Sequence, residues 1–376
     1  MTSLAAESTA GAASDPQPYE LVWYACDATT GGIVEELPGL TAQGAISRQL
    51  GGPTTASFNL FLPSAPADWV AATEKGRGLL LAVDPATDTP LWSGLILTRE
   101  GGSSQSLDLQ AITPEGYLDR RYVGDLSLIG QDQATVITSV MTAPLSQGLP
   151  FVMDAVATGV TMDWISLDAD DRTVLSAMQQ IMGVDGGPEW TIDPIWADAA
   201  HTTIDLAVRV RSKIGTQLAI PEAVFDFPGC VSAYRLTESY ETGRGATVVT
   251  ARGEGEGEGR LTSAAQVATA LEAAGWPRYV YRWTPASGIT DPTQLTAHAA
   301  RALTLMGTGS SVWTLEATAS RAPRLGRDWA LGDTVSVDIA TSARHPDGAA
   351  TVARAWSWEL DPSSDGINPI LVEEEA

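Results

Sequence analysis

Side chains that commonly carry catalysis or metal binding are few in this sequence, and they lie far apart. The three histidines are His201, His298 and His345. None of them stands at a metal-ligand spacing from another histidine, a cysteine or a glutamate. The sequence contains neither a Gly-x-Ser-x-Gly nucleophile motif nor a phosphate-binding P-loop, and it offers no pair of carboxylates suited to acid–base catalysis. We therefore predict no enzymatic activity, no catalytic residue and no cofactor.

The densest group of carboxylates lies in residues 253–260, whose sequence is GEGEGEGR. Three alternating glutamates could begin a loose Ca²⁺ site, but the spaced aspartates of a calcium loop are absent. A solvated loop hinged on glycines explains the pattern without a metal, so we predict no metal ligand. A β-branched run at 247–250 precedes it, and we expect a buried strand to end where a mobile or closely packed loop begins. The candidate subunit-contact residues of this loop are Gly253, Gly255, Gly257 and Arg260.

Composition predicts a globular, β-rich protein of two or three domains. The 376 residues exceed the size of one ordinary core, and 44% apolar with 18% charged residues is typical of folded proteins. The 36 glycines and 22 prolines favour many short strands over long helices. A formal charge of −24 argues against a nucleic-acid-binding face and against docking on anionic lipid.

The cysteines and the N-terminal residues indicate in which compartment the protein is made. Cys26 and Cys230 are far apart in sequence, and two buried free thiols are favoured, with a single disulfide left open. Residues 1–18 lack lysine, arginine and an apolar segment, so they predict a flexible arm and no signal peptide. No apolar run approaches the length that spans a bilayer, and no membrane insertion is predicted. We expect a chain made and kept in a cytoplasm, or released by lysis.

The segment 19–124 carries short β-prone runs separated by turn residues, a spacing typical of barrels and sandwiches. These runs lie at 20–26, 45–50, 57–62, 78–83, 91–99 and 106–112. In the fifth run the sequence LWSGLI contains Trp92 and Gly94. A glycine inside a strand predicts a bulge or a close approach of another backbone, as at a barrel corner or a subunit contact.

From about residue 125 helices and strands alternate. A short amphipathic helix is predicted at 133–141, and a second has its apolar positions between Val174 and Met182. Aspartates at 168–171 are candidate caps for the second helix, and Gly183 stands at its end. Alternating apolar residues at 203–210 predict a strand.

The remaining residues predict a second β domain interrupted by helices. Its first strands are expected at 234–241 and 247–250, and its later strands at 311–320, 334–339 and 352–359. Helices are expected at 263–274 and at 291–306, the second with Asp291 as cap and Pro292 as first residue. The chain is therefore a loose duplication of one β domain on either side of an α/β segment.

Several of the 12 tryptophans fall in alternating strands, where packing in the core is their usual role. They are Trp92, Trp190, Trp313 and Trp356. Trp356 and Trp358 share a face with Arg354, which suggests a surface that is half core and half interface. Exposed tryptophans bind saccharides, and a saccharide-binding function stays open as the alternative.

Four motifs occur in an order that resembles one protein family. They are Trp92-x-Gly94-x-Ile96, then Pro188-Glu189-Trp190, then a β-branched strand that ends in the glycines of 253–260, then Leu331-Gly332-Asp333 with the strand after it. Together they resemble the tail-tip baseplate hub, or minor tail protein, of long-tailed (siphovirus) phages of actinobacteria. The resemblance covers most of residues 19–360. In that family the Pro-Glu-Trp motif opens a small mixed sheet.

The resemblance implies a mainly β fold with α+β inserts, built from two β-barrel hub-type domains and a mixed α/β domain. A flexible arm would occupy 1–18, the first barrel 19–124 and the α+β domain 125–232. The second barrel would occupy 233–376 and carry a helical insertion at 261–308.

The implied function is structural. Three subunits with two barrels each would form a homotrimeric ring that links the sixfold tail tube to the threefold tip and lines the DNA exit channel. The implied partners are the distal tail protein, the tape measure protein and other tail-tip proteins, with DNA only passing through. The location would be the virion tail tip, assembled in the host bacterial cytoplasm. A carbohydrate-binding, receptor-binding or distal tail module and a cell-wall enzyme are the other classes considered.

Overall fold

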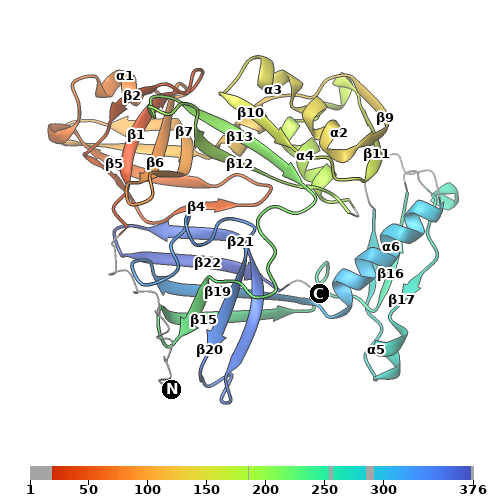
Figure 1. The fold of residues 1–376 in the computed structure, drawn as a ribbon. Helices are drawn as coiled ribbons and strands as arrows, with labels where there is room; N and C mark the ends of the chain where they lie inside the picture. Colours follow the sequence, from red (N-terminus) through yellow and green to blue (C-terminus); the bar gives the residue numbers. More distant parts are fainter. Residues whose placement is uncertain (1–18, 185, 254–256, 285–291, 374–376) are drawn as a thin grey trace, which may run out of the picture.

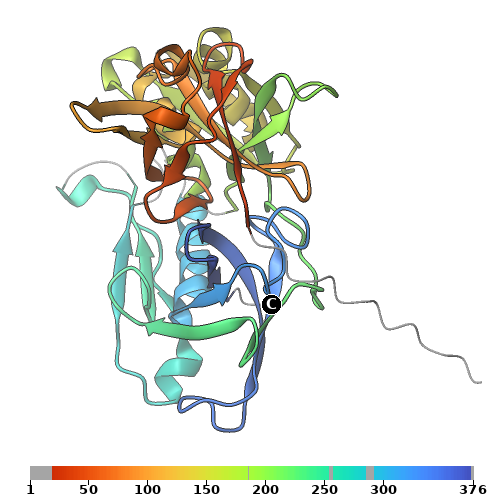
Figure 2. The same cartoon turned by 90° about the vertical axis from the view of Figure 1, so that its left-hand side faces the viewer.

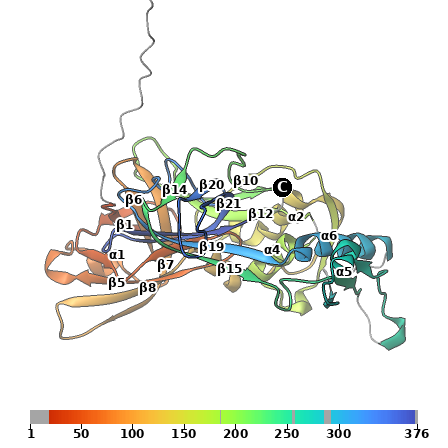
Figure 3. The ribbon, with the colours of Figure 1, turned by 90° about the horizontal axis from the view of Figure 1, so that it is seen from below.

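The computed structural model describes residues 19–184, 186–253, 257–284 and 292–373, and within them the protein is mainly β (Figure 1). The predicted arm at 1–18, Gly255 and the predicted cap Asp291 lie outside the described residues. Four parts follow one another: a first barrel, a middle unit, and a second barrel that carries an insert. Figures 1 and 3 place the insert at the end of the molecule opposite the first barrel.

The first barrel is a seven-stranded sheet in the order β2-β1-β6-β7-β8-β5-β3. Its strands are β1 Val22–Asp27, β2 Ile33–Glu36, β3 Leu40–Ala42, β5 Thr55–Phe61, β6 Gly78–Asp84, β7 Thr89–Gly101 and β8 Ser106–Ile112. Short helices η1 Leu62–Ser64, α1 Trp69–Ala72 and η2 Pro114–Arg120 flank them. The edge strands β2 and β3 are consecutive and only residues 37–39 separate them, so the sheet must roll up until its two edges meet.

The second barrel repeats this arrangement in the order β14-β20-β21-β22-β19-β15. Its strands are β14 Val224–Phe227, β15 Val231–Ser239, β19 Ser310–Thr318, β20 Thr334–Ile339, β21 Ala349–Asp361 and β22 Gly366–Val372. Its edge strands β14 and β15 are again consecutive, with residues 228–230 between them, so this sheet also rolls up.

The two barrels share one strand order, which confirms the predicted duplication. With β2 set aside, the first barrel runs β1-β6-β7-β8-β5-β3, and each strand corresponds in chain order to β14-β20-β21-β22-β19-β15. The central strands β7 and β21 both have 13 residues and both contain a register shift. One difference is that β1 runs antiparallel to β6, whereas β14 runs parallel to β20.

The middle unit packs short helices on two small sheets. One sheet is β10-β13-β12 and the other is β11-β9. The elements are β9 Leu126–Asp132, α2 Gln133–Val140, α3 Thr142–Ser146, β10 Phe151–Ala155, β11 Thr161–Ser166, η3 Asp168–Asp170, α4 Val174–Met182, β12 Glu189–Trp196 and β13 Ile204–Arg211. Since β10 is parallel and β12 antiparallel to β13, the Pro-Glu-Trp motif does open a mixed sheet.

Both predicted helices of the middle unit are present, but the predicted cap is wrong. Thr173 caps α4, and its hydroxyl accepts a hydrogen bond from the Ser176 amide. Residues 168–170 instead form η3 one turn earlier, and Asp171 ends it in the left-handed region at φ +46°. A threonine next to the first helical residue competes well with more distant aspartates for the free amides.

The insert is a three-stranded sheet covered by one long helix. Its elements are β16 Val248–Ala251, η4 Gly257–Gly259, β17 Gln266–Val267, α5 Thr269–Ala273, β18 Val280–Trp283 and α6 Pro292–Gly307, and the sheet order is β17-β16-β18. Leu295, Ala299 and Met306 of α6 form a separate small core with β16.

Two predictions fail in the insert. The run 247–250 is not a strand of the second barrel but the centre of the insert's own sheet. The helix expected at 263–274 is reduced to the five residues of α5, so the insertion is mixed α/β and not helical. Its first residues pair with β16 instead: the Ser263 amide donates to the Ala251 carbonyl, and Ser263 Oγ accepts from the Ala251 amide. Tertiary pairing here overrides the helix propensity of an alanine-rich stretch.

The two barrels are interlocked, as the stacked sheets in Figure 2 suggest. Strand β4, Ile46–Gln49, belongs by sequence to the first barrel but pairs with β21 of the second. Strand β14 precedes the expected domain boundary at 232 and yet lies in the second barrel's sheet. One hydrophobic core runs through both barrels, from Trp23 and Trp92 to Trp329 and Trp358. The barrels therefore fold against each other as one body.

Gly94 provides the space that Trp92 fills, which gives a first testable prediction. A Cβ at Gly94 would lie 2.3 Å from the Trp92 indole, and that indole is held by Trp23 and Phe58 at ring distances of 6.4 and 5.5 Å. Gly94→Ala is therefore expected to lower the free energy of unfolding by about 1–3 kcal/mol through overpacking, measured by urea titration. Gly102→Ala is the control, because a Cβ there meets no atom within 4 Å. Equal losses in both variants would contradict this account of Gly94.

Candidate functional site

Two motifs that are far apart in sequence meet at one buried arginine, Arg354 of β21. Arg354 is 1% exposed, and its guanidinium faces the carboxylate of Glu189 at the start of β12. Nη1 donates to Glu189 Oε1 over 2.5 Å, and Nη2 donates to Oε2 of the same carboxylate. Nε donates to the Gly332 carbonyl and Nη2 to the Ile214 carbonyl, each over 2.8 Å. The Pro-Glu-Trp and Leu-Gly-Asp motifs thus form one node between the middle unit and the second barrel.

The backbone around this node explains its glycines. Gly332 has φ +89°, and a Cβ there would lie 2.5 Å from the Ile214 carbonyl oxygen. Asp333 holds the turn, accepting hydrogen bonds from the Ala330 amide over 2.8 Å and from the Thr216 amide over 2.5 Å. Glycine and a short carboxylate are the residue types that a tight turn of this kind requires.

The other members of these motifs fill cores. Trp190 is fully buried in the middle unit, Leu331 is buried in the core of the two barrels, and Pro188 is buried too. Trp92 is fully buried in the first barrel, where its Nε1 donates to the Ser47 carbonyl. Trp358 is also buried, and Arg354 faces Glu189 inside the protein. The surface around Trp356 and Trp358, which was expected to be half core and half interface, is therefore largely internal.

A second buried ion pair joins the barrels directly. Asp84, at the end of β6, has no exposed side-chain surface, and it accepts hydrogen bonds from Nε and Nη2 of Arg324 over 2.6 and 2.7 Å. The Arg324 guanidinium also lies over the Tyr19 ring, 4.2 Å from its centroid. Burial opposes ionisation of Asp84, but hydrogen bonds from Arg324, the Ala86 amide and Thr87, together with the charge of Arg324, outweigh burial and hold the pKa of Asp84 below its ordinary value.

A third buried arginine ties β4 to the middle unit. Arg48 Nη2 contacts three groups of β12: Thr191 Oγ1 at 2.9 Å, the Ile192 carbonyl at 2.7 Å and Asp193 Oδ1 at 2.5 Å. Arg324 and Arg354 therefore join the second barrel to the first barrel and to the middle unit, and Arg48, on the strand β4 that pairs with the second barrel, adds a further link to the middle unit. Such charge-assisted bonds hold a fixed geometry, so we infer that the two barrels and the middle unit move as one rigid body.

Glu115 lies near Arg48 and gives a second testable prediction. It is 2% exposed, and its Oε1 accepts a hydrogen bond from the Ile192 amide. Burial raises the pKa of Glu115 above its ordinary 4.5, and attraction to Arg48 offsets only part of this. Between pH 4.5 and the raised pKa, the unfolded chain releases this proton and the folded chain keeps it, so stability falls as pH rises.

We therefore expect Glu115→Gln to stabilise the fold increasingly above pH 4.5. The gain over the parent chain should grow by up to about 1.4 kcal/mol per pH unit within that window and vanish in more acidic solution. Urea unfolding of both proteins from pH 4 to pH 8 measures the difference. A gain that does not depend on pH would contradict a neutral buried Glu115.

The glycine-rich loop is closed at its base by Arg260. The Gly253 amide donates to the Leu261 carbonyl, and Arg260 Nε donates back to the Gly253 carbonyl over 2.8 Å. Arg260 Nη2 also reaches Thr284 Oγ1. Gly257 is exposed and has φ +65°. Gly253 and Arg260 thus meet each other, but they lie in the insert, away from the node at Arg354.

The histidines and cysteines form no shared site. His201 stacks on Trp196 with ring centroids 4.5 Å apart, His298 packs edge-on to Trp283, and His345 stacks near Trp313. Cys26 and Cys230 are buried free thiols, which rejects the disulfide, and burial raises the pKa of each to about 12. In the part of the chain that the structure describes, no group of three or more His, Cys, Asp or Glu is placed to hold a metal. None of the described helices has the length and apolar composition needed to cross a bilayer.

Sequence reasoning missed Arg48, Asp84 and Arg324. A signal was available for Arg48, which lies two residues after the buried Ile46 and two before the buried Leu50. An arginine in phase with the inward positions of a strand predicts a buried, paired guanidinium. No comparable pattern marks Arg324, which lies in a loop.

Comparison with solved structures finds this fold in phage tail proteins. The 43 kDa tail protein of prophage MuSo2 from Shewanella oneidensis matches with a TM-score of 0.60 and 13% identity, over 94% of this chain and 98% of that one. The tail protein from Neisseria meningitidis MC58 matches with 0.57 and 14%, over 94% and 97%. Prophage tail protein gp18 from Listeria monocytogenes EGD-e matches with 0.54 and 10%, over 94% of each chain.

Sequence comparisons add no closer relative. No protein-family model and no curated protein matches this sequence. At identities of 10–14% the likeness is one of fold, and it extends over nearly the full length of all three tail proteins. The chain has the fold of phage tail proteins.

Proposed function

We propose that this chain is a structural protein of a phage tail tip, a baseplate hub whose subunits form a trimeric ring around the DNA exit channel. The fold likeness to three tail proteins over at least 94% of every chain supports a tail role. The observation that carries the hub assignment is the repeat of one strand order in two barrels locked into one body.

Two equivalent barrels per subunit suit a protein that lies between a tail tube of sixfold symmetry and a tip of threefold symmetry. Three subunits would present six barrels of one topology to the sixfold tube above, while the middle units and inserts would keep threefold symmetry below. The buried ion pair Asp84–Arg324 would fix the spacing of the barrels within each subunit, and Glu189–Arg354 would fix the middle unit on the second barrel. A ring of this kind closes by head-to-tail contacts between different faces of the subunit.

The charge of the chain fits a passage for DNA better than a binding site. A formal charge of −24 would repel phosphate and let DNA slide through the lumen without adhering. The proposed partners are the distal tail protein, the tape measure protein and other tail-tip proteins. The proposed location is the tail tip of a long-tailed phage of an actinobacterium, after assembly in the host cytoplasm.

The saccharide-binding alternative has weaker support. Trp92, Trp190 and Trp313 are at most 2% exposed, so their rings offer no platform for a sugar. The structural likeness to tail proteins likewise favours an assembly role over a cell-wall enzyme.

Native mass across a concentration range tests the proposal. We expect the purified chain to show a trimer that dissociates on dilution, detected by native mass spectrometry and analytical ultracentrifugation. A chain that stays monomeric up to millimolar concentration, or that forms only dimers, would reject the trimeric ring.

The glycine-rich loop is proposed as a subunit contact within this ring. Alanine at Gly259, where a Cβ would meet no atom within 4 Å, should weaken trimer formation while the monomer keeps its thermal midpoint. Gly257 is left unchanged, because its φ of +65° would make alanine strain the backbone by itself. Unchanged trimer formation would reject the loop as a contact.

A further inference from the structure

Charge is unevenly distributed between the insert and the rest of the chain. Residues 241–309 contain six arginines and six acidic residues, so the whole formal charge of −24 lies outside them. Three of those six acidic residues belong to the glycine-rich loop 253–260. The remaining part of the insert is therefore cationic on a strongly acidic protein, and it suits an acidic partner.

An aromatic cluster, which we call the knob, joins the half-buried Tyr240, which follows β15, to the exposed Trp276 and Tyr279 of the insert. The Tyr240 ring lies 5.1 Å from the ring of Trp276 and 5.1 Å from that of Tyr279. Trp276 is 42% exposed and Tyr279 46% exposed. Tryptophan and tyrosine in contact, with this much surface in water, are the residue types that dominate protein interfaces.

Hydrogen bonds hold the knob in place before any partner binds. Gly275, at φ +87°, turns the chain after α5, and the Trp276 amide donates to the Leu271 carbonyl. The Tyr279 amide donates to Thr247 Oγ1 over 2.8 Å, and the Tyr279 carbonyl accepts from the amides of Thr247 and Val248. A rigid knob loses little conformational entropy when it binds.

Two arginines lie near the knob, one just before β18 and one on it, and β18 is an edge strand of the insert's sheet. Arg278 immediately precedes Tyr279, and its side chain is 62% exposed while it pairs with Glu272. Arg282 is exposed further along β18, and Val280 between them is 54% exposed. Since side chains alternate along a strand, Val280 and Arg282 point to the face of β18 opposite Tyr281, and the knob and its cations meet along this exposed edge of the insert's sheet.

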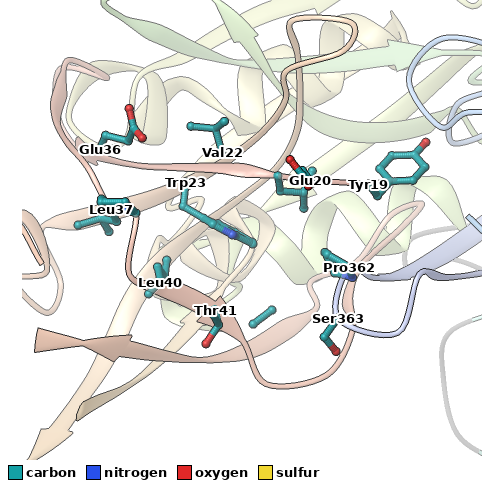
Figure 4. Close-up of a pocket in the computed structure, with 13 residues that line it drawn as sticks. Tyr19, Glu20, Val22, Trp23, Glu36, Leu37, Leu40, Thr41, Pro362 and Ser363 are labelled. Carbon is teal, nitrogen blue, oxygen red and sulfur yellow. The ribbon is translucent and has the colours of Figure 1, made fainter. Parts of the chain in front are cut away.

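A complementary pocket lies at the other end of the molecule, at the seam where the edges of the first barrel meet (Figure 4). Its volume is about 350 Å³, at the lower end for ligand cavities. Apolar side chains line it, among them Val22, Trp23, Leu37 and Leu40. Its acidic residues are Glu20 and Glu36, both exposed, and Pro362 of the β21–β22 turn closes one side.

We propose that the knob of one copy docks in the seam pocket of the next copy, with Arg278 and Arg282 against Glu20 and Glu36. Figures 1 and 3 place the insert and the first barrel at opposite ends of the subunit, as a head-to-tail contact requires. The contact rests on the proposed ring and names the surfaces that close it. Such a contact would let copies of a chain with a charge of −24 associate, because arginines of one copy would meet glutamates of the next.

Charge exchange between the two surfaces tests the contact. Four variants of the full chain are compared with the parent: Trp276→Ala with Tyr279→Ala, Arg278→Glu with Arg282→Glu, Glu20→Arg with Glu36→Arg, and the last two pairs combined. Sedimentation gives the trimer dissociation constant, and thermal unfolding confirms that each monomer is folded. Glu100→Arg and Arg235→Glu are controls, because both residues are exposed and lie outside the two surfaces.

We expect each of the first three variants to weaken the trimer at least about tenfold, the usual effect of losing an interface anchor or opposing like charges. The combined charge exchange should return the constant to within about threefold of the parent. A trimer that tolerates all the variants, or charge pairs that weaken it without mutual rescue, would overturn this contact and leave the hub proposal standing. A chain that never forms a trimer would overturn both.

Discussion

Arg354→Met is expected to lower the free energy of unfolding by about 3–5 kcal/mol, because it leaves the carboxylate of Glu189 buried without its cation. The variant also removes the donor to the Gly332 and Ile214 carbonyls, which hold the turn of the second barrel against the middle unit. Urea unfolding at neutral pH measures the loss, and a separate early transition of the middle unit would show that the node joins the two parts.

Two further variants test whether the loss comes from the unpaired carboxylate and whether it is specific to the buried pair. Adding Glu189→Met to Arg354→Met should recover part of the loss, since the orphaned carboxylate is gone while the two carbonyls still lack their donor. Arg327→Met is the surface control, because the Arg327–Asp328 pair is half exposed and surface pairs contribute little. A similar loss at Arg354 and Arg327 would contradict the special role of the buried node.

Asp84→Ala is expected to be comparably destabilising, by about 3–5 kcal/mol, because Arg324 stays buried over Tyr19 without its counter-charge. Asp84 also accepts hydrogen bonds from the Ala86 amide and from Thr87 Oγ1, which shape the β6–β7 turn. The barrels should lose their fixed relation, and the melting transition should broaden.

The pH dependence of this variant has a definite sign. The pKa of Asp84 is lowered in the folded chain, so its contribution is fully present above the ordinary value near 3.8 and is lost as pH falls through the folded pKa. The parent chain should therefore lose more stability than Asp84→Ala on acidification below pH 4. Parallel stability curves for the two proteins in acid would contradict an ionised Asp84 in the fold.

Much of the fold could be predicted from the sequence because alternation and turn residues are local. Strand β20 occurs where its alternation places it, and α2, α4 and α6 occur where their apolar spacing predicts. The run 247–250 has the same local character as a barrel strand, and only pairing with β17 and β18 assigns it to the insert. Local patterns predict the type of an element but not its partner.

The candidate site shows the same limit. The two motifs identify Glu189 and Gly332. Nothing in either motif indicates that Arg354 contacts both, although Glu189 precedes Arg354 by 165 residues. Inward-facing arginines in apolar strands give a partial signal, as Arg48 and Arg354 illustrate. The partner carboxylates follow only from the packing of three separate parts. Exposure of Trp276 and Tyr279 is likewise a property of the folded insert.

Electron microscopy of the assembled chain tests the central claim most directly. A reconstruction without imposed symmetry should show a threefold ring whose central hole is surrounded by six barrels, alternating between the first and second barrel of each subunit. A ring with only one kind of barrel at the hole, or single copies at every concentration, would contradict the hub assignment.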